Sequence, residues 1–147
     1  MEASFLLPDV DDADSAPFWQ GCTRAELLLQ ACADCGAIRM PPRPMCPHCH
    51  SLKQRWQPSA GRGTVWSFVV PHPPLLPAYS ELAPFNVIVV ALDDHPGVRL
   101  VGNLVATADA PINSVAPESI RIGEPVRVVF QPIGGATLPR WVRDDRR

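Results

Sequence analysis

Short stretches in which apolar residues alternate with polar ones, or follow one another directly, fill the second half of the chain. Alternation with a period of two indicates a strand with one buried face, and a short apolar run between turn residues indicates a buried strand. Long helices are disfavoured by the 18 prolines, because proline lacks the amide hydrogen that a helix needs. The pattern predicts five strands, at residues 64–70, 85–92, 98–105, 126–131 and 136–142.

The order of these strands favours a small barrel. A helical turn is predicted at 117–120, and five strands with a short helix between the third and fourth fit a Greek-key barrel of the OB type. Gly102 is a candidate β-bulge. The loop 71–84 is longer than a hairpin needs, and long loops often carry function. On the fourth strand, the side chains expected to point inward are Val126, Val128 and Phe130.

The first half of the chain has a different pattern. A short helix is predicted from Ser15, which can cap it, with Pro17 in its first turn. A strand is predicted at 26–31 and another at 53–58, where Trp56 would cover the module between them. Apolar side chains that would share one side of the helix are Phe18, Trp19 and Cys22.

Two C-x-x-C pairs lie between those strands, Cys32 with Cys35 and Cys46 with Cys49. Each pair can bind one metal ion from a tight turn, and two pairs complete the closed tetrahedral site of structural zinc. A redox pair or disulfides would not need a second matching motif. The flanking His48 and His50 are not expected ligands because four thiolates already fill the site, and Cys22 is expected to be a buried, inert thiol.

The expected fold is therefore mainly β: a short helix, a rubredoxin-like zinc ribbon and a five-stranded OB barrel. The boundaries follow from composition, with Gly61-Arg62-Gly63 between ribbon and barrel. An acidic tail, mobile or ordered by a partner, is expected to precede the helix. The predicted segments are the tail 1–14, helix and ribbon 15–60, barrel 61–142 and a charged tail 143–147.

Charge is unevenly distributed although the net charge is only −2. The ribbon region is basic, which suits a phosphate-bearing ligand or nucleic acid, or only offsets the thiolates. No apolar run approaches the roughly 20 residues of a membrane span, and the acidic start is unlike a secretory signal. With four cysteines assigned to a metal, we expect a reducing, cytoplasmic location.

Several motifs resemble a known family. They are F-W-Q-G, E-L-L-L-Q-A-C-A-D-C-G, P-P-R-P-M-C-P-H-C, G-R-G-T-V-W-S-F, A-P-F-N-V-I-V-V-A-L, R-L-V-G-N-L-V and I-G-E-P-V-R-V-V-F, spread over residues 17–142. Together they resemble the zinc-ribbon/OB-fold family catalogued as domain of unknown function 35 and later described as acyl-CoA-associated. The acidic start and the C-terminal W-V-R-D-D-R-R lie partly outside that pattern.

The resemblance implies a non-catalytic small subunit that completes or bridges a thiolase-like acyl-CoA enzyme. Settings known for the family include thiolases, retro-aldolases of steroid side-chain degradation, and the bridge between thiolase and hydroxymethylglutaryl-CoA synthase. Its ligand would be coenzyme A (CoA) or an acyl-CoA, whose phosphates suit arginines and whose pantetheine arm suits an apolar groove. Candidate phosphate contacts are Arg39, Arg43, Arg55 and Arg62, and candidate groove walls are Tyr79 and Phe85. Surface charge and core packing compete with these roles.

Two other functions are open at this point. Ribbons and OB barrels also bind single-stranded nucleic acid, but this chain has one lysine and a net negative charge. A self-sufficient enzyme is disfavoured because neither G-x-S-x-G nor H-E-x-x-H occurs. For the accessory subunit we expect an exposed apolar contact surface, from the loop 71–84 with Tyr79 or from the helix and ribbon. The helix–ribbon candidates are Phe18, Trp19, Leu27, Leu29, Met40, Met45 and Trp56.

Overall fold

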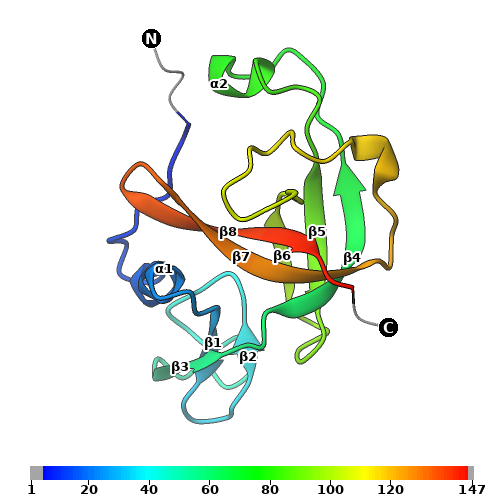
Figure 1. Ribbon diagram of the computed structural model, residues 1–147. Coiled ribbons are helices and arrows are strands. Elements are labelled where there is room, and N and C mark those ends of the chain that lie inside the picture. The colour runs from blue at the N-terminus through cyan, green and yellow to red at the C-terminus, as the bar shows by residue number, and fades with distance from the viewer. Residues whose placement is uncertain (1–4, 146–147) are drawn as a thin grey trace.

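A computed structural model describes residues 5–145 of the chain as a short helix and two β-sheets (Figure 1). The N-terminal helix α1 (Ala16–Thr23) is followed by a three-stranded antiparallel sheet in the order β2-β1-β3. Its strands are β1 (Leu28–Cys32), β2 (Ile38–Arg39) and β3 (Gln54–Pro58), so both strands predicted around the cysteines are confirmed.

The second sheet has five strands in the order β6-β5-β4-β7-β8 and curls into a half-barrel typical of an OB-fold. The segment after β6 reaches β8 through a parallel bridge between Leu104 and Trp141, which brings the two edges of the sheet together. All five predicted strands and the helical turn are present. Their bounds are β4 (Arg62–Val69), β5 (Val87–Leu92), β6 (Arg99–Gly102), η1 (Pro117–Ser119), β7 (Pro125–Ile133) and β8 (Ala136–Arg143).

The bulge lies on a different strand from the predicted one. β6 pairs with β5 without interruption through Gly102, whereas the register of β4 shifts between Val65 and Ser67. Gly102 has another role, since a Cβ atom there would lie 2.9 Å from the ring of Trp141, which is only 1% exposed. The glycine therefore makes room for the largest buried side chain of the barrel.

The helix start also differs in one detail from the prediction. Ser15 occupies the N-cap position and a proline lies in the first turn, but the Ser15 side chain makes no capping hydrogen bond. Its hydroxyl donates to Asp12 Oδ2 at 2.9 Å and accepts from Trp19 Nε1 at 3.3 Å. The hydroxyl is therefore used to tether Trp19 and the preceding segment.

One continuous apolar core joins the two sheets. Phe18 and Cys22 of α1 and Leu29 of β1 pack in the same cluster as Val65 and Trp141 of the barrel. On β7, Val126 is buried as predicted, while Val128 and Phe130 are partly buried and pack against that core. Cys22 is buried, as expected, and burial raises the pKa of its thiol to about 12, which favours the protonated form.

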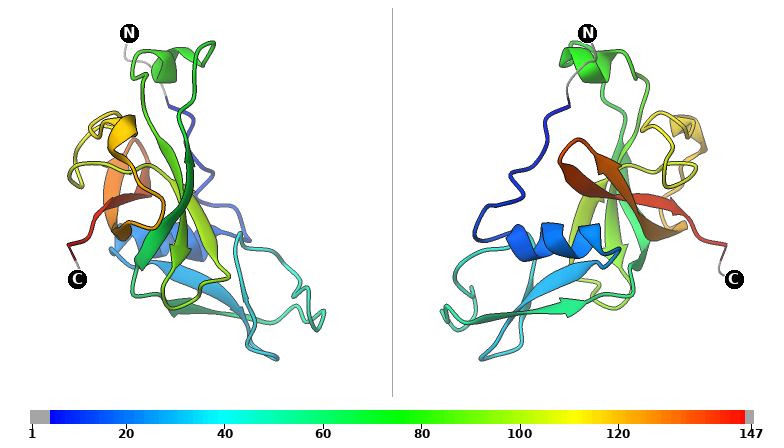
Figure 2. Two further views of the ribbon diagram at one scale, coloured as in Figure 1. Left: turned by 90° about the vertical axis from the view of Figure 1, so that its right-hand side faces the viewer. Right: turned by 60° about the vertical axis from the view of Figure 1, so that its left-hand side comes forward.

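The loop 71–84 contains a one-turn helix, α2 (Pro77–Ser80), which the proline-rich sequence did not suggest. From residue 5 the chain runs beside the half-barrel from the α2 end to α1 (Figure 2). Phe5 packs edge-on against Tyr79 with 5.1 Å between ring centroids. Residues 1–4 of the predicted acidic tail and 146–147 of the charged tail lie outside the described residues. Within the described part, no helix is long and apolar enough to cross a membrane.

Candidate functional site

The four cysteine thiols form one compact cluster at the end of the ribbon. All four sulfur atoms lie within 4.8 Å of one another. The separations are 3.5 Å between Cys32 and Cys49 and 3.6 Å between Cys35 and Cys46. Four thiolates around a tetrahedral zinc, with Zn–S bonds of about 2.3 Å, lie roughly 3.8 Å apart. The arrangement fits zinc.

Both metal-binding turns have the same backbone design. The residue after each pair has a positive φ, 78° at Gly36 and 63° at His50. Its amide donates to the carbonyl of the first cysteine of the pair, at 3.0 Å in each case. Only glycine adopts this conformation without cost, so the glycine predicted for the first turn is confirmed, whereas the second turn uses a histidine.

The turns also favour the thiolate form. The backbone amide of Cys35 donates to Cys32 Sγ at 3.4 Å and lowers the pKa of Cys32 to about 6. The amide of Ser51 favours the thiolate of Cys49, but hydrogen bonds with the neighbouring cysteines, together with burial, raise the pKa of Cys49 to about 12. A divalent cation stabilises all four thiolates at once, which is the physical reason for such a cluster to bind a metal.

A cavity of about 470 Å³ lies at the seam between ribbon and barrel. Arg39 and Arg43 line it from the ribbon, together with His48, and Asp94 and His95 line it from the β5–β6 turn. The Asp94 carboxylate accepts hydrogen bonds from the Ser59 hydroxyl and the amide of Ala60, so it is directed to the backbone beside the cavity.

Arg39 is 4% exposed, and its side chain holds the loop between the two cysteine pairs. Nε and Nη2 donate to the carbonyl of Arg43 at 3.2 and 2.9 Å, while Nη1 is buried and has no hydrogen-bond partner among residues 5–145. The buried Gln30 bonds both the amide and the carbonyl of Arg43, at 2.8 and 2.9 Å. The sequence analysis did not identify Gln30, because its role depends on a residue thirteen positions away.

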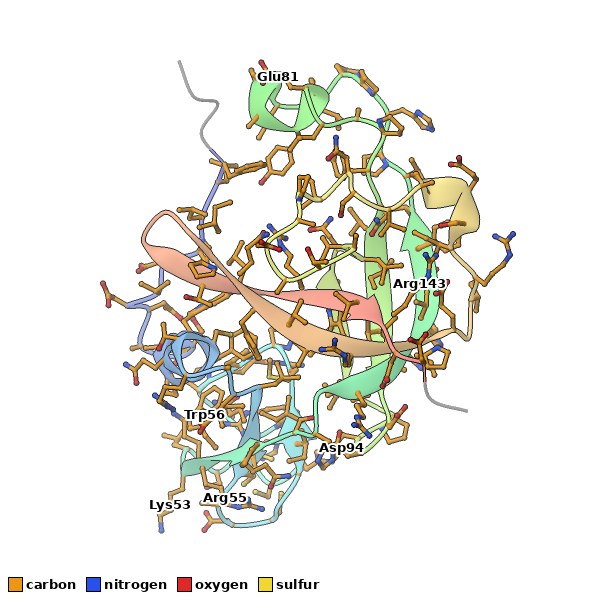
Figure 3. All side chains as sticks on the ribbon, in the orientation of Figure 1. Lys53, Arg55, Trp56, Glu81, Asp94 and Arg143 are labelled. Carbon is orange, nitrogen blue, oxygen red and sulfur yellow. The ribbon has the colours of Figure 1, made fainter. Side chains whose placement is uncertain are left out.

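The six residues predicted to contact CoA do not form a single site. Arg39 and Arg43 lie together at the seam cavity. Arg55 is exposed on β3 and donates to Gln57, and Arg62 faces Asp144 at 3.9 Å. Of the aromatic candidates, Tyr79 is part of α2 and Phe85 follows it in the chain. The label of Glu81, at the end of α2, shows that this helix lies at the end of the molecule opposite Arg55 (Figure 3). There Tyr79 packs on the buried Phe85, with ring centroids 6.0 Å apart.

The expected apolar surface on the helix and ribbon is not present, because most of its members are buried. Phe18, Leu27 and Leu29 are at most 7% exposed, because α1 and β1 pack together against the barrel. Trp19, Met40 and Trp56 are partly buried against the same core, so of the predicted set only Met45 is exposed, at 48%.

An apolar surface occurs instead on the outer face of the barrel, over β4, β5 and β6. Trp66 at the bulge is 50% exposed, Val69 59% and Val101 68%. The strand register places Ser67, Val89 and Val101 in one row on this face. The Arg99 guanidinium lies 4.0 Å above the Trp66 ring. We call these residues the outer β4–β6 face.

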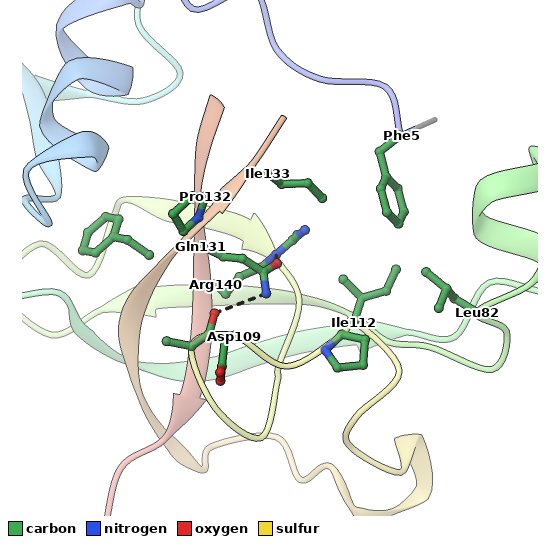
Figure 4. A pocket seen from close by; sticks show the side chains of 11 residues that line it. Phe5, Leu82, Asp109, Ile112, Gln131, Pro132, Ile133 and Arg140 are labelled. Atoms are coloured by element: carbon green, nitrogen blue, oxygen red, sulfur yellow. Dashed lines mark hydrogen bonds between the residues drawn. The ribbon is translucent and has the colours of Figure 1, made fainter. Parts of the chain in front are cut away.

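A second cavity, of about 480 Å³, is lined by the loop at 108–112 and by β7 and β8 (Figure 4). Its cationic group is Arg140 of β8, which the sequence analysis did not single out. This residue sits in an ordinary strand pattern, and only the curled sheet brings it beneath the loop at 108–112.

A four-cysteine centre on a small antiparallel sheet, followed by a five-stranded half-barrel, defines a zinc-ribbon/OB-fold protein. Two family descriptions match the chain in that order: "ChsH2, rubredoxin-like zinc ribbon domain" at residues 19–53 and "ChsH2, C-terminal OB-fold domain" at residues 56–131. The chain belongs to this ChsH2-type DUF35 family, which confirms the resemblance seen in the sequence.

Solved structures agree with this assignment. A chain of an "Ltp2-ChsH2(DUF35) aldolase" superimposes with a TM-score of 0.78 at 34% identity, covering 93% of this chain and 98% of that one. A DUF35 protein of unknown function from Sulfolobus solfataricus gives a TM-score of 0.58 at 13% identity, covering 92% of this chain and 89% of that one, and supports the fold alone.

Curated relatives fall into two kinds. A probable enoyl-CoA hydratase alpha subunit from Thermomonospora curvata is 39% identical over 77% of this chain, and a 3-oxo-4,17-pregnadiene-20-carboxyl-CoA hydratase alpha subunit from Mycobacterium tuberculosis is 36% identical over 90%. The chain spans only 32% and 38% of their lengths. A DUF35 domain-containing scaffold protein from Methanothermobacter thermautotrophicus is 29% identical over 75% of each chain.

Proposed function

We propose that this protein is a non-catalytic accessory subunit of a thiolase-like acyl-CoA enzyme. The observation that carries the proposal is the match to the ChsH2(DUF35) chain of an aldolase, at 34% identity over 98% of that chain. The scaffold protein and the acyl-CoA hydratase subunits among the relatives support the same class of role. Of the settings implied by the family, a thiolase or a steroid side-chain aldolase fits best.

Zinc has a structural role in this proposal. Cys32, Cys35, Cys46 and Cys49 would hold it in a closed site that leaves no position for water or substrate. Zinc then stabilises the ribbon, and the carbon–carbon bond chemistry belongs to the partner. The isolated chain should show no thiolase, aldolase or hydratase turnover on CoA thioesters. Turnover by a pure sample that a point substitution abolishes would contradict this.

The partner contacts the outer β4–β6 face. Exposed apolar residues on β4 and β6, with the half-buried Val89 of β5 between them and an arginine beside an aromatic ring, have the composition of an interface centre. This surface replaces the helix–ribbon surface expected from the sequence. Other exposed apolar side chains, such as Ile122, lie outside it.

The test is co-expression with a candidate thiolase-like partner, followed by size-exclusion chromatography and titration. Val101 and Ile122 are both aliphatic and both 68% exposed, so they form a matched pair. Val101→Asp should raise the Kd of the complex about tenfold or more, and Ile122→Asp should leave it unchanged. Separate elution of the wild-type proteins at micromolar concentration would remove the proposal; equal effects of the two substitutions would remove only the assigned surface.

CoA or an acyl-CoA is the proposed ligand of the assembled enzyme, with its phosphates at the seam cavity. The exposed Arg43 and Nη1 of Arg39, which has no hydrogen-bond partner within residues 5–145, supply positive charge there, whereas Arg55 and Arg62 lie elsewhere. In calorimetric titrations of the complex with CoA, Arg43→Met should weaken binding several-fold and Arg55→Met should not. Equal affinities of both variants and the wild type would exclude the seam cavity.

Single-stranded nucleic acid is the alternative ligand, and one observation favours it. Trp66 and Arg99 lie on the face formed by the first three barrel strands, where OB-folds bind oligonucleotides. A net charge of −2 opposes this function. Binding of a fluorescent oligothymidine that depends strongly on salt, and that Trp66→Ala abolishes, would favour nucleic-acid binding over the accessory-subunit role.

A further inference from the structure

The cavity of about 480 Å³ has apolar walls. They are contributed by the chain before α1, the end of loop 71–84, the loop at 108–112 and the β7–β8 hairpin (Figure 4). A smaller cavity of about 80 Å³ adjoins it and shares Phe5, Ile112, Ile133 and Arg140. The principal apolar wall residues are Phe5, Leu82, Ile112, Phe130 and Ile133.

Arg140 is the cation of this cavity. It is 9% exposed, and its two bonded nitrogens have neutral partners: Nε donates to Gln131 Oε1 at 3.1 Å and Nη1 to Asn103 Oδ1 at 2.6 Å. Nη2 has no hydrogen-bond partner among residues 5–145, and none of the ion pairs in that part of the chain involves Arg140. Burial lowers the pKa of Arg140, and the neighbouring Tyr79 opposes this shift.

A buried guanidinium stays charged, and a charge removed from water without an opposite charge is costly. In this cavity the Arg140 guanidinium is nevertheless held in a fixed orientation. Gln131 Nε2 donates to the carbonyls of Ala110 and Ala108 at 2.9 and 3.2 Å, and Asn103 Nδ2 donates to the carbonyl of Asn86. These bonds direct both amide oxygens at the guanidinium, so its free edge is fixed in advance.

One acidic residue, Asp109, also lines the cavity. It is exposed and accepts a hydrogen bond from the Thr107 hydroxyl at 2.7 Å, which lowers the pKa of Asp109. It makes no ion pair with Arg140 among the described residues, so it does not neutralise the buried charge. A ligand that does so must bring its own negative charge and must fit between apolar walls.

We propose that this cavity binds a small amphipathic carboxylic acid, with the carboxylate on Nη2 of Arg140 and the apolar body between Phe5, Ile112 and Ile133. The volume lies within the roughly 300–1,000 Å³ range of small-molecule sites. A carboxylate forms short, charge-assisted bonds to a guanidinium, and the surrounding apolar walls exclude water from them. The proposal does not depend on the partner enzyme, because every contact is made by this chain.

The test uses octanoate as the probe, with acetate and 1-octanol as its two halves. Octanoate should bind the zinc-loaded protein, measured by nuclear magnetic resonance shifts of the Ile112 and Ile133 methyl groups and the Arg140 side chain. Its Kd should be at least about tenfold lower than that of either half. Arg140→Met should reduce octanoate binding to the level of octanol, and Arg55→Met should have no effect.

A substitution at a buried position can disturb folding, so a second variant is included. Phe5→Ala removes one wall without entering the core of the barrel, and it should weaken octanoate binding several-fold while thermal unfolding stays unchanged. Equal binding of octanoate and octanol, shifts that occur away from the cavity, or wild-type affinity in Phe5→Ala or in a folded Arg140→Met would each overturn the proposal.

Discussion

The ribbon and the barrel use the same small device but are stabilised by different means. In each, a fully buried carboxamide bonds both backbone groups of one distant residue: Gln30 with Arg43 in the ribbon and Asn86 with Leu104 in the barrel. In the barrel this link is added to strands of up to nine residues around a large core. In the ribbon β2 has only two residues, so the fold depends on the cysteine cluster. The difference predicts that loss of the metal unfolds the ribbon first, and that disturbance of the apolar core destabilises the barrel.

Loss of the metal should have the largest effect. Cys46→Ser, or a strong chelator, should unfold the ribbon because metal binding and folding of such a module are one event, with apparent energies of about 10–16 kcal/mol in small zinc domains. Zinc content should fall from about one ion per chain, and limited proteolysis should cut residues 32–58 first. Cys22→Ala is the control that keeps its zinc. A metal-free ribbon as resistant to protease as the wild type would contradict the comparison.

Crowding the barrel should affect only the barrel. Gly102→Ala places a methyl group 2.9 Å from the buried Trp141 ring, and overpacking of this kind costs about 1–3 kcal/mol. Gly97→Ala is the matched control, since nothing lies within 4 Å of a Cβ there. Urea unfolding should separate the two variants, and both should bind zinc normally. Equal urea midpoints of the two variants would show that the space between Gly102 of β6 and Trp141 of β8 can accommodate a methyl group.

The paired carboxamides test the comparison most directly. Gln30→Ala and Asn86→Ala should each cost about 1–3 kcal/mol, because each leaves a buried amide and carbonyl unpaired. Only Gln30→Ala should also weaken zinc binding, since Gln30 positions the loop between the cysteine pairs. A competition assay with a chromophoric chelator measures this. Equal zinc affinities of Gln30→Ala and Asn86→Ala would show that the position of this loop does not affect zinc binding.

The smallest expected effect concerns pH. Burial raises the pKa of Cys22 from 9.0 to about 12 in the folded chain, so the unfolded chain releases this proton first. The contribution of Cys22 to stability is therefore complete below pH 9 and is lost as the pH rises from about 9 towards 12. Unfolding free energies of the wild type and Cys22→Ala, measured across this window, should converge as the pH rises. Parallel curves would indicate an accessible thiol, as would rapid alkylation at pH 8.

The sequence predicted features that depend on local pattern. Alternation located the barrel strands, and the spacing of the cysteines identified the ribbon. Features that depend on distant contacts were missed. The bulge between Val65 and Ser67 puts Trp66 and Phe68, which strict alternation would place on one face of β4, on opposite faces. The packing of α1 against the barrel buries Phe18 and Leu29, which an isolated ribbon would expose. Arg140 follows the alternation of β8, and only folding gives it neutral partners and an apolar surrounding.

The packing of α1 on β8 has a consequence for the order in which the chain acquires its structure. A ribosome releases the helix long before Trp141, so Phe18 and Cys22 have no complete surface to cover until the end of the barrel has emerged. The cysteine pairs, by contrast, are close in sequence and can capture metal early. Contacts between distant segments form slowly. We therefore expect nascent chains that stop before β8 to hold zinc yet expose the apolar side of α1, which makes them substrates for chaperones.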